Sequence, residues 1–253
     1  MKKHINDQLH HGVSQLGYLS VLSLDGEFDS VIQLLQGQLT SNCLALNNAN
    51  GQLSALCDEK GFVLCNFEIL NHESMLLIVI DEMQVAIFCE QMEKLLPFFK
   101  VTISHTDYKI EGLALNKNES LLPGEHMLIS SQDVRLSMRI QSKKGDTSGI
   151  ASISHEQWSI NRKVLNDHVI DAKDSGKYRP HELNQDKTRV SFEKGCYRGQ
   201  EIIARMEYLG KQKKKTSLIV HEEQSEIESH PLIGQTIPWL GLLYSSCLLK
   251  VSN

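Results

Sequence analysis

A chain of 253 residues with 41% hydrophobic and 23% charged residues has an ordinary globular composition and room for two or three compact units. Its net charge of −5 argues against a dedicated nucleic-acid-binding protein, because such a protein usually carries a basic field. No apolar stretch approaches the roughly eighteen residues of a membrane span, and the first residues are polar, so we expect a cytoplasmic protein without a membrane partner.

The cysteines and histidines show no spacing typical of a metal site. None of the six cysteines forms a C-x-x-C pair, and the doublet His10-His11 has no partner at a suitable distance in sequence. We therefore predict no permanently bound metal. Apart from Cys196, the cysteines are expected to be small buried apolar residues in a reducing compartment.

The first half of the chain predicts an antiparallel meander flanked by two helices. Alternating apolar residues between turn residues predict strands over residues 21–24, 53–57, 62–70 and 75–80. The first helix should be capped by Asp29 and end at Gly37. The second should be capped by Asp81, because apolar residues follow it with a 3.6-residue period and end near Pro97.

The second half continues with strands and one well-marked helix. Strands are expected over residues 101–104, 109–115, 127–130, 134–140 and 216–221, with a polar turn at residues 143–146. Ser154 and Gln157 form a capping box for a helix that carries Trp158. This tryptophan is expected in the core, with a stacking platform for a ligand as the alternative. Residues 171–186 have no periodicity and predict a long loop.

The segment Lys194–Arg205 is the most unusual stretch. Two glycines lie close to Cys196 on either side, and Lys194 and Arg198 place positive charge beside its thiol. The following residues favour a helix that begins after Gly199. A thiol near a helix N-terminus and two cations is favoured as thiolate, and such a place also suits a bound anion.

The element order indicates an α+β fold, because strands alternate with single helices. We predict three domains: residues 1–115, an α+β unit; residues 116–215, a second α+β unit that carries the unusual segment; and residues 216–253, a short barrel-like unit.

Residues Lys194–Glu201 read KGCYRGQE and resemble the K-G-C-[YF]-x-G-Q-E motif of the YgfZ family. These are folate-binding proteins of iron–sulfur cluster assembly and repair, related to the T-protein (aminomethyltransferase) of the glycine cleavage system. Further segments resemble the family in the same order: Gln36–Thr40, Cys57–Gly61 and Asp174–Asn184. The resemblance covers about residues 16–220.

This resemblance implies a ring of small domains, ferredoxin-like α+β units plus a reduced C-terminal β-barrel, around a central channel for tetrahydrofolate or another reduced folate. Cys196 is the candidate reactive thiol. The residues expected to border the folate are Tyr18, Trp158, Lys194, Gly195, Tyr197, Gly199, Gln200, Glu201 and Arg205. Lys211, Lys213 and Lys214 are expected near the glutamate carboxylates of the folate, as is Arg205, because opposite charges attract.

One departure separates this chain from the aminomethyltransferases, which carry an aspartate pair on an early strand. The comparable place here ends with Cys65-Asn66, and the next carboxylate is Glu68. An asparagine cannot act as a base. A second departure is the short tail after Glu222, which predicts a reduced last domain.

Three functions remain open at this stage. The first is a folate-binding protein that supports iron–sulfur enzymes, including those that modify tRNA, with iron–sulfur factors or client enzymes as partners. The second is a tetrahydrofolate-dependent aminomethyltransferase. The third is a non-catalytic scaffold for iron–sulfur factors. Direct tRNA binding is not expected, because the one lysine cluster lies on an acidic chain.

Overall fold

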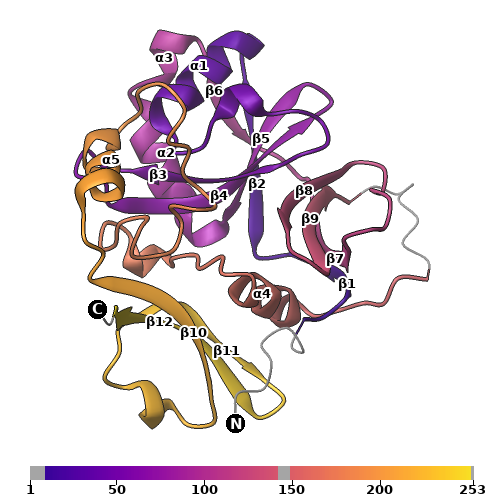
Figure 1. Ribbon diagram of the computed structural model, residues 1–253. Coiled ribbons are helices and arrows are strands. Elements are labelled where there is room, and N and C mark those ends of the chain that lie inside the picture. Colours follow the sequence, from indigo (N-terminus) through magenta and orange to yellow (C-terminus); the bar gives the residue numbers. More distant parts are fainter. Residues whose placement is uncertain (1–8, 142–148, 252–253) are drawn as a thin grey trace.

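The computed structural model describes residues 9–141 and 149–251, and the turn predicted at residues 143–146 lies outside them. The described residues form three antiparallel sheets with helices packed between and around them (Figure 1). The α+β class predicted from the element order is therefore confirmed. Within the described residues, no helix is both long enough and apolar enough to cross a membrane.

The largest sheet has five strands in the order β3-β4-β5-β2-β6. It contains the predicted meander, and its strands are β2 (Leu19–Asp25), β3 (Gln52–Cys57), β4 (Val63–His72), β5 (Met75–Asp81) and β6 (Thr102–His105). Side chains alternate between its two faces. One face packs Leu22, Phe67 and Ile78 against the helices, and the other packs Leu70 and Leu77 against the second sheet.

Helix α1 (Phe28–Gln38) begins one residue before the predicted cap. Glu27 occupies the N-cap position without a side-chain hydrogen bond, and Asp29 lies in the first turn, so the predicted Asp29 cap is wrong. A carboxylate in the first turn still favours the helix through the helix dipole. Gly37 lies inside the helix rather than at its end. Leu34 and Leu35 are fully buried, as the periodicity indicates.

The second predicted helix is divided into three short pieces. Asp81 does act as a cap, because its Oδ1 accepts a hydrogen bond from the Met83 amide at 2.9 Å, but it caps the 3₁₀ helix η3 (Glu82–Gln84). Helix α2 (Val85–Glu93) follows, and helix α3 (Leu96–Phe99) begins after a break at Lys94 and Leu95. Pro97 lies in the first turn of α3, and a proline has no amide hydrogen to continue a preceding helix, so the break falls just before it.

The second sheet has the strand order β1-β7-β9-β8. Its strands are β1 (Gly12–Gln15), β7 (Ile110–Asn116), β8 (Glu125–Ser130) and β9 (Val134–Ile140). Strand β7 pairs with β1 on one side and with β9 on the other, so this sheet joins strands from both sides of the predicted domain boundary at residue 115.

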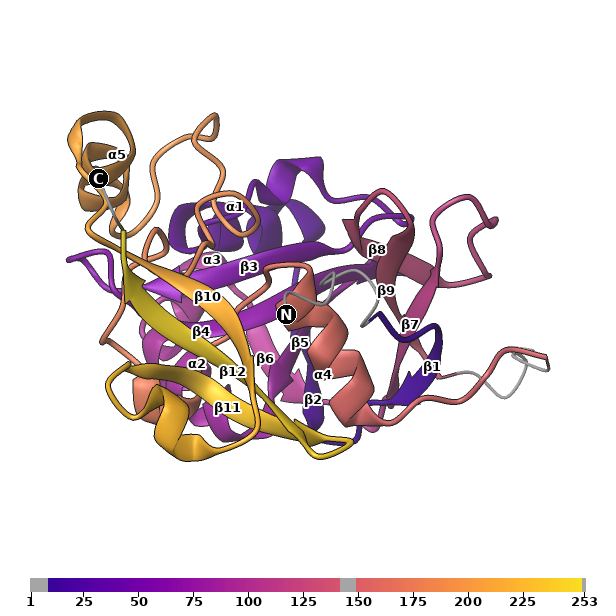
Figure 2. The same ribbon diagram turned by 60° about the horizontal axis from the view of Figure 1, so that its bottom comes forward.

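Helix α4 (His155–Val164) carries the predicted capping box, with Ser154 and Gln157 bonded to each other's backbone amides. Its Trp158 is fully buried and lies against Gly112 of β7, where an added Cβ would be 2.8 Å from the indole ring. The helix lies between the second sheet and the C-terminal sheet (Figure 2).

The C-terminal residues form a three-stranded sheet with the order β10-β12-β11. Its strands are β10 (Lys214–His221), β11 (Leu232–Trp239) and β12 (Leu242–Lys250). In the described part of the chain this sheet does not close, because β10 and β11 each pair only with β12, so the expected barrel is an open sheet here. Helix α5 (Gln200–Leu209) begins directly after Gly199, as predicted.

The remaining segments are irregular. The predicted loop at residues 171–186 consists of turns and the 3₁₀ helix η4 (Ala172–Asp174). Two further 3₁₀ helices are η2 (Cys43–Ala45) and η5 (Gln224–Ile227).

Candidate functional site

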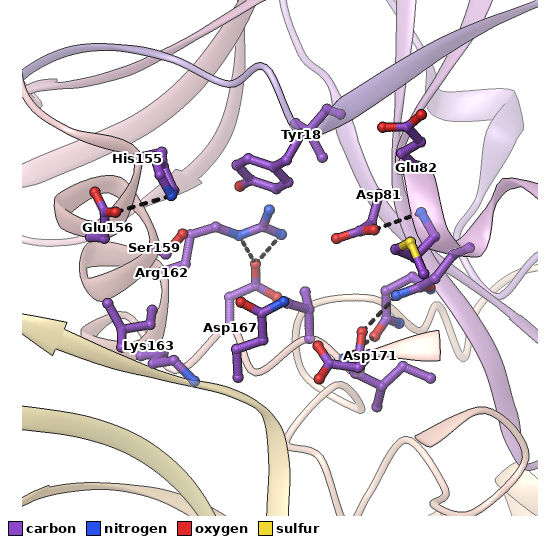
Figure 3. A pocket seen from close by; sticks show the side chains of 18 of the residues that line it. Tyr18, Asp81, Glu82, His155, Glu156, Ser159, Arg162, Lys163, Asp167 and Asp171 are labelled. Atoms are coloured by element: carbon purple, nitrogen blue, oxygen red, sulfur yellow. Dashed lines mark hydrogen bonds and ion pairs between the residues drawn. The ribbon is translucent and has the colours of Figure 1, made fainter. Parts of the chain in front are cut away.

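A cavity of about 410 Å³ opens between the largest sheet, helix α4 and the C-terminal sheet (Figure 3). Its walls come from the start of β2, Asn66 and Glu68 of β4, the end of β5 with η3, one face of α4, residues 167–171, and strand β11. These elements lie far apart in the sequence. The cavity volume falls in the range of sites that hold small-molecule ligands, about 300–1,000 Å³.

Four buried charged residues form a closed ion-pair network beside the cavity. Arg162 of α4 reaches Glu68 at 2.6 Å through Nη2 and Asp167 at 2.7 Å through Nε. Arg189 reaches the same two carboxylates at 3.2 Å and 3.0 Å. Two positive and two negative charges balance within this group, which makes their burial tolerable.

The network fixes the protonation states of Asp167 and Arg162. Burial alone would raise the pKa of Asp167, but Arg162 and Arg189 outweigh it and lower that pKa to about 2. Burial would likewise lower the pKa of Arg162, and the neighbouring Asp167 and Glu68 carboxylates raise it instead. Asp167 and Arg162 therefore stay charged at neutral pH, and Asp167 is not available as a base.

Asp81 is a carboxylate of the cavity wall that lies outside the ion-pair network. It lines the cavity at the end of β5. Burial raises its pKa, and this effect outweighs the hydrogen bond from the Met83 amide, which lowers it; the nearby carboxylates of Asp171 and Glu82 raise the pKa further. Its Oδ1 is bonded to that amide. A carboxylate in this setting accepts hydrogen bonds from N–H groups of a ligand.

Lys163 brings a buried amine to the opposite wall. Its Nζ donates to Ser246 Oγ at 2.8 Å, and the Ser246 hydroxyl lies 2.9 Å from Nδ1 of His168. Burial lowers the pKa of Lys163 to about 8. Burial also lowers the pKa of His168 to about 4, with Lys163 contributing, so that ring is neutral and accepts from Ser246.

Tyr18 supplies the aromatic surface of the cavity. Figure 3 shows its ring above the guanidinium of Arg162 and opposite Asp81. Its ring centroid lies 6.0 Å from that of His155, which is on the rim. Burial raises the pKa of Tyr18, so its phenol remains protonated at neutral pH. An aromatic face beside hydrogen-bonding groups suits a planar heterocyclic ligand.

Asn66 occupies the place where the sequence lacks the expected aspartate, and it is a structural residue. Its side-chain oxygen accepts from the Ile170 amide at 3.1 Å and from Gln185 Nε2 at 2.9 Å. Its side-chain nitrogen donates to Gln185 Oε1 at 3.1 Å. These contacts occupy the amide group, which holds the 167–171 wall against β4.

Of the residues predicted to border the folate, Tyr18 alone lines this cavity. Trp158 has no exposed surface and packs in the core between the first two sheets, so its ring has no free face for stacking. The predicted residues of the segment 194–205 lie outside the cavity, as do Lys211, Lys213 and Lys214.

The segment Lys194–Gly199 packs instead against two other segments that resemble the same family. Lys194 Nζ donates to the carbonyls of Leu39 at 2.6 Å and Ser41 at 2.8 Å, at the exit of α1. Tyr197 is buried against Cys57, at the end of β3. The structure thus brings together segments 36–41, 57–61 and 194–199.

Gly199 is required by this packing. Its φ is 81°, and a Cβ there would lie 2.4 Å from the Asp58 carbonyl oxygen. Arg198 also binds the turn at residues 58–61, because its Nε donates to Glu59 at 2.9 Å. Its Nη1 donates to Gln91 at 2.9 Å. At Gly199 the segment therefore forms a packing joint with the turn at residues 58–61, where the glycine allows a close backbone contact.

Cys196 is exposed at this joint. The two cations predicted beside it face elsewhere, since Lys194 binds backbone carbonyls and Arg198 binds Glu59. Gly195 is exposed and has no neighbouring atom within 4 Å of an added Cβ. Glu201 and Arg205 form an exposed ion pair of 3.2 Å along α5, and Lys211, Lys213 and Lys214 are exposed.

The cavity residues that the sequence reasoning missed carry little local signal. Asp81 is predicted as a helix cap, which it is, and nothing in the sequence singles out Arg162 or Lys163. Their burial is the signal, since arginine and lysine are rarely buried unless they are paired. Burial becomes visible only in the folded chain. In the described residues, no group of three or more His, Cys, Asp or Glu side chains could hold a metal ion.

Comparison with known proteins identifies sequence relatives of this chain. No protein-family model matches the chain. The tRNA-modifying protein YgfZ of Colwellia psychrerythraea is 28% identical over 248 residues, which cover 88% of this chain and 76% of that protein. The chain is related to the YgfZ proteins. A second YgfZ protein, from Blochmanniella pennsylvanica, is also 28% identical, over 88% of this chain and 79% of its own length.

The fold has a solved counterpart. The glycine cleavage system aminomethyltransferase T from Bartonella henselae superimposes with a TM-score of 0.64, over 97% of this chain and 80% of that protein. The sequence identity is 11%, so this likeness concerns the fold alone. The resemblance to YgfZ proteins inferred from the motif, with an aminomethyltransferase-like fold, is thus confirmed.

Proposed function

We propose that this chain is a YgfZ-like folate-binding protein of the cytoplasm that supports the assembly or repair of iron–sulfur clusters in enzymes, including enzymes that modify tRNA. The ligand is tetrahydrofolate or another reduced folate, bound in the cavity beside α4. The likeness to YgfZ proteins supports the general function.

The observation that carries the proposal is the set of groups around the cavity. Tyr18 offers an aromatic face to the pterin ring, and Asp81 offers an acceptor to its N–H groups. Lys163 offers a cation to a carboxylate of the glutamate tail. A folate carries all three of these chemical groups, and a bound folate would place its reduced ring system away from water.

Aminomethyl transfer is the second candidate, and the fold alone favours it. The carboxylates nearest to the place of the missing aspartate pair are held in the ion-pair network, and Asn66 is held by Gln185 and Ile170. No free base is left on that part of β4. We therefore expect no turnover with tetrahydrofolate and an aminomethyl-lipoyl donor, and measurable turnover would favour the transferase.

Titration calorimetry with 5-formyltetrahydrofolate tests the binding proposal. We expect saturable binding that Tyr18→Leu and Asp81→Asn each weaken by roughly 1–3 kcal/mol, because the first removes a stacking surface and the second a charged acceptor. Lys213→Met is the matched control, since Lys213 is exposed and outside the cavity. Its affinity should equal that of the parent protein.

Two outcomes would overturn the proposal. Absence of binding would favour a scaffold for iron–sulfur factors, and a loss of affinity in Lys213→Met as large as in the cavity variants would place the folate elsewhere. Direct tRNA binding is not part of the proposal, and we expect no gel shift with tRNA at near-physiological salt.

A further inference from the structure

One buried side chain lies far from the cavity and has no explanation in its surroundings. His126 of β8 is 2% exposed, and neither of its ring nitrogens has a hydrogen-bond partner. Buried polar groups in folded proteins are almost always paired, and an unpaired one points to a missing ion or water. Leaving such a ring unpaired costs about 1–3 kcal/mol.

A second histidine faces this ring across the interface between the first two sheets. The ring centroids of His72 and His126 are 6.3 Å apart, with an angle of 64° between the ring planes. Two imidazoles that bind one ion from opposite sides, at metal–nitrogen distances of about 2.0 Å, have centroids on the order of 6 Å apart. The observed separation therefore matches a shared ion with little movement.

Each of the two histidines has a methionine directly opposite it on the neighbouring strand. His72 pairs with Met75 in the β4–β5 hairpin, and His126 pairs with Met138 between β8 and β9. Directly opposite residues project from the same face of a sheet. Met75 and Met138 both belong to the apolar cluster between the two sheets, so both pairs face the same interior.

This set of side chains has a defined chemical preference. Thioether sulfur is a soft ligand that selects Cu(I), and imidazole also suits copper. Hard cations such as Mg²⁺ require oxygen ligands instead. His72 and Met75 are half-buried beside the exposed hairpin turn Glu73-Ser74, which gives an ion a route from solvent.

We infer that His72, His126, Met75 and Met138 form a binding site for one Cu(I) ion between the two sheets. The site is separate from the cavity beside α4, and the inference does not depend on folate binding. The two histidines are far apart in the sequence, so their spacing along the chain could not indicate the site.

Competition for Cu(I) against the chelator bicinchoninate, under reducing conditions, tests the inference. The measurement uses the full chain with Cys196→Ser, because that exposed thiol also binds copper. We expect one Cu(I) per chain that is lost in both His126→Leu and His72→Asn. His126→Leu should fold, because replacing an unpaired buried polar group by an apolar one is nearly neutral or stabilising.

The thioether ligands are tested by a matched pair of variants. Met138→Leu should weaken Cu(I) binding at least tenfold, whereas Met127→Leu should not, because Met127 is the next residue after His126 on β8 and projects from the other face. X-ray absorption of the copper-loaded protein should show both imidazole and sulfur neighbours. Unchanged copper retention in His126→Leu, or equal effects of the two methionine variants, would overturn the site.

Discussion

Lys194 is a buried amine whose positive charge is bound by backbone rather than by a carboxylate. Two carbonyl oxygens, from Leu39 and Ser41, accept its hydrogen bonds, and burial lowers its pKa to about 8. Its Nζ also lies 4.9 Å from the centroid of the Tyr197 ring, within the range of a cation–π contact. At the scale of one residue, the motif lysine holds the exit of α1 in place.

Cys196 differs from the other cysteines in being exposed, so its removal should not disturb the fold. We expect Cys196→Ala to change the free energy of unfolding by less than about 0.5 kcal/mol, as is usual for a surface position. The same variant should fail to complement a defect in an iron–sulfur enzyme. Cys89→Ala, which removes a half-buried thiol on α2, is the control, and this variant should complement the same defect. Full complementation by Cys196→Ala would exclude a reactive role for the thiol.

His168 makes the stability depend on pH. It is fully buried among Lys163, Asp167, Asn166 and Ser246, and its pKa falls from an ordinary value near 6.5 to about 4. As the pH falls, the unfolded chain therefore takes up a proton at His168 before the folded chain does. The contribution of this residue to the free energy of unfolding, on the order of 3 kcal/mol, is fully present above pH 6.5 and is lost as the pH falls toward 4.

Urea unfolding at pH 7 and pH 4.5 measures this effect. The loss of stability between the two pH values should be about 2–3 kcal/mol smaller in His168→Asn, in which no proton is taken up at this position. His155→Asn should behave like the parent protein, because that imidazole is exposed. An equal loss in the parent and His168→Asn would contradict the assignment.

At the scale of elements, the joint between α5 and the turn at residues 58–61 depends on one glycine. Gly199→Ala should destabilise the protein by about 2–5 kcal/mol, since its φ of 81° disfavours a side chain and the added Cβ would contact the Asp58 carbonyl. Gly124→Ala isolates the backbone effect, because Gly124 has a similar φ of 71° and no atom within 4 Å of an added Cβ. It should cost only about 1–2 kcal/mol. Equal losses in urea unfolding would show that close packing at residue 199 is unimportant.

At the scale of the whole molecule, Arg189 joins parts of the chain that are distant in sequence. Its Nη1 donates to the carbonyls of Ser54 at 2.8 Å and Phe67 at 3.0 Å, and its other nitrogens bind Glu68 and Asp167. The same network holds Arg162 at the cavity. The largest sheet, α4 and the 167–171 wall thus share one group of charges.

Removing this guanidinium should affect the protein as a whole. We expect Arg189→Met to destabilise it by about 3–5 kcal/mol, because two buried carboxylates lose a partner. Arg205→Met should cost no more than about 0.5 kcal/mol, since its ion pair with Glu201 is exposed. Urea unfolding of both variants measures the difference, and a small loss in Arg189→Met would show that Arg162 alone balances the carboxylates.

Local patterns in the sequence predicted most of the elements. Strands β3, β4 and β5 were visible as alternating apolar residues between turn residues, and the capping box marked the start of α4. Strands β1, β11 and β12 were not predicted. The errors in the predicted helices lie at their ends, at Asp29, Gly37 and Pro97, where a cap or a break depends on one or two hydrogen bonds. The C-terminal barrel was expected from the family resemblance, and no local pattern indicated an open sheet.

The sequence by itself determined the α+β class and the likeness to YgfZ proteins carried by segment 194–201. These depend on neighbouring residues or on spacing along one helix or strand. Tertiary structure alone decided where the cavity lies, because its walls come from six separate parts of the chain. It also decided that Lys194, Tyr197 and Gly199 form a packing joint. Burial and charge pairing arise only when distant segments meet, and they are the properties that distinguish a binding group from a structural one.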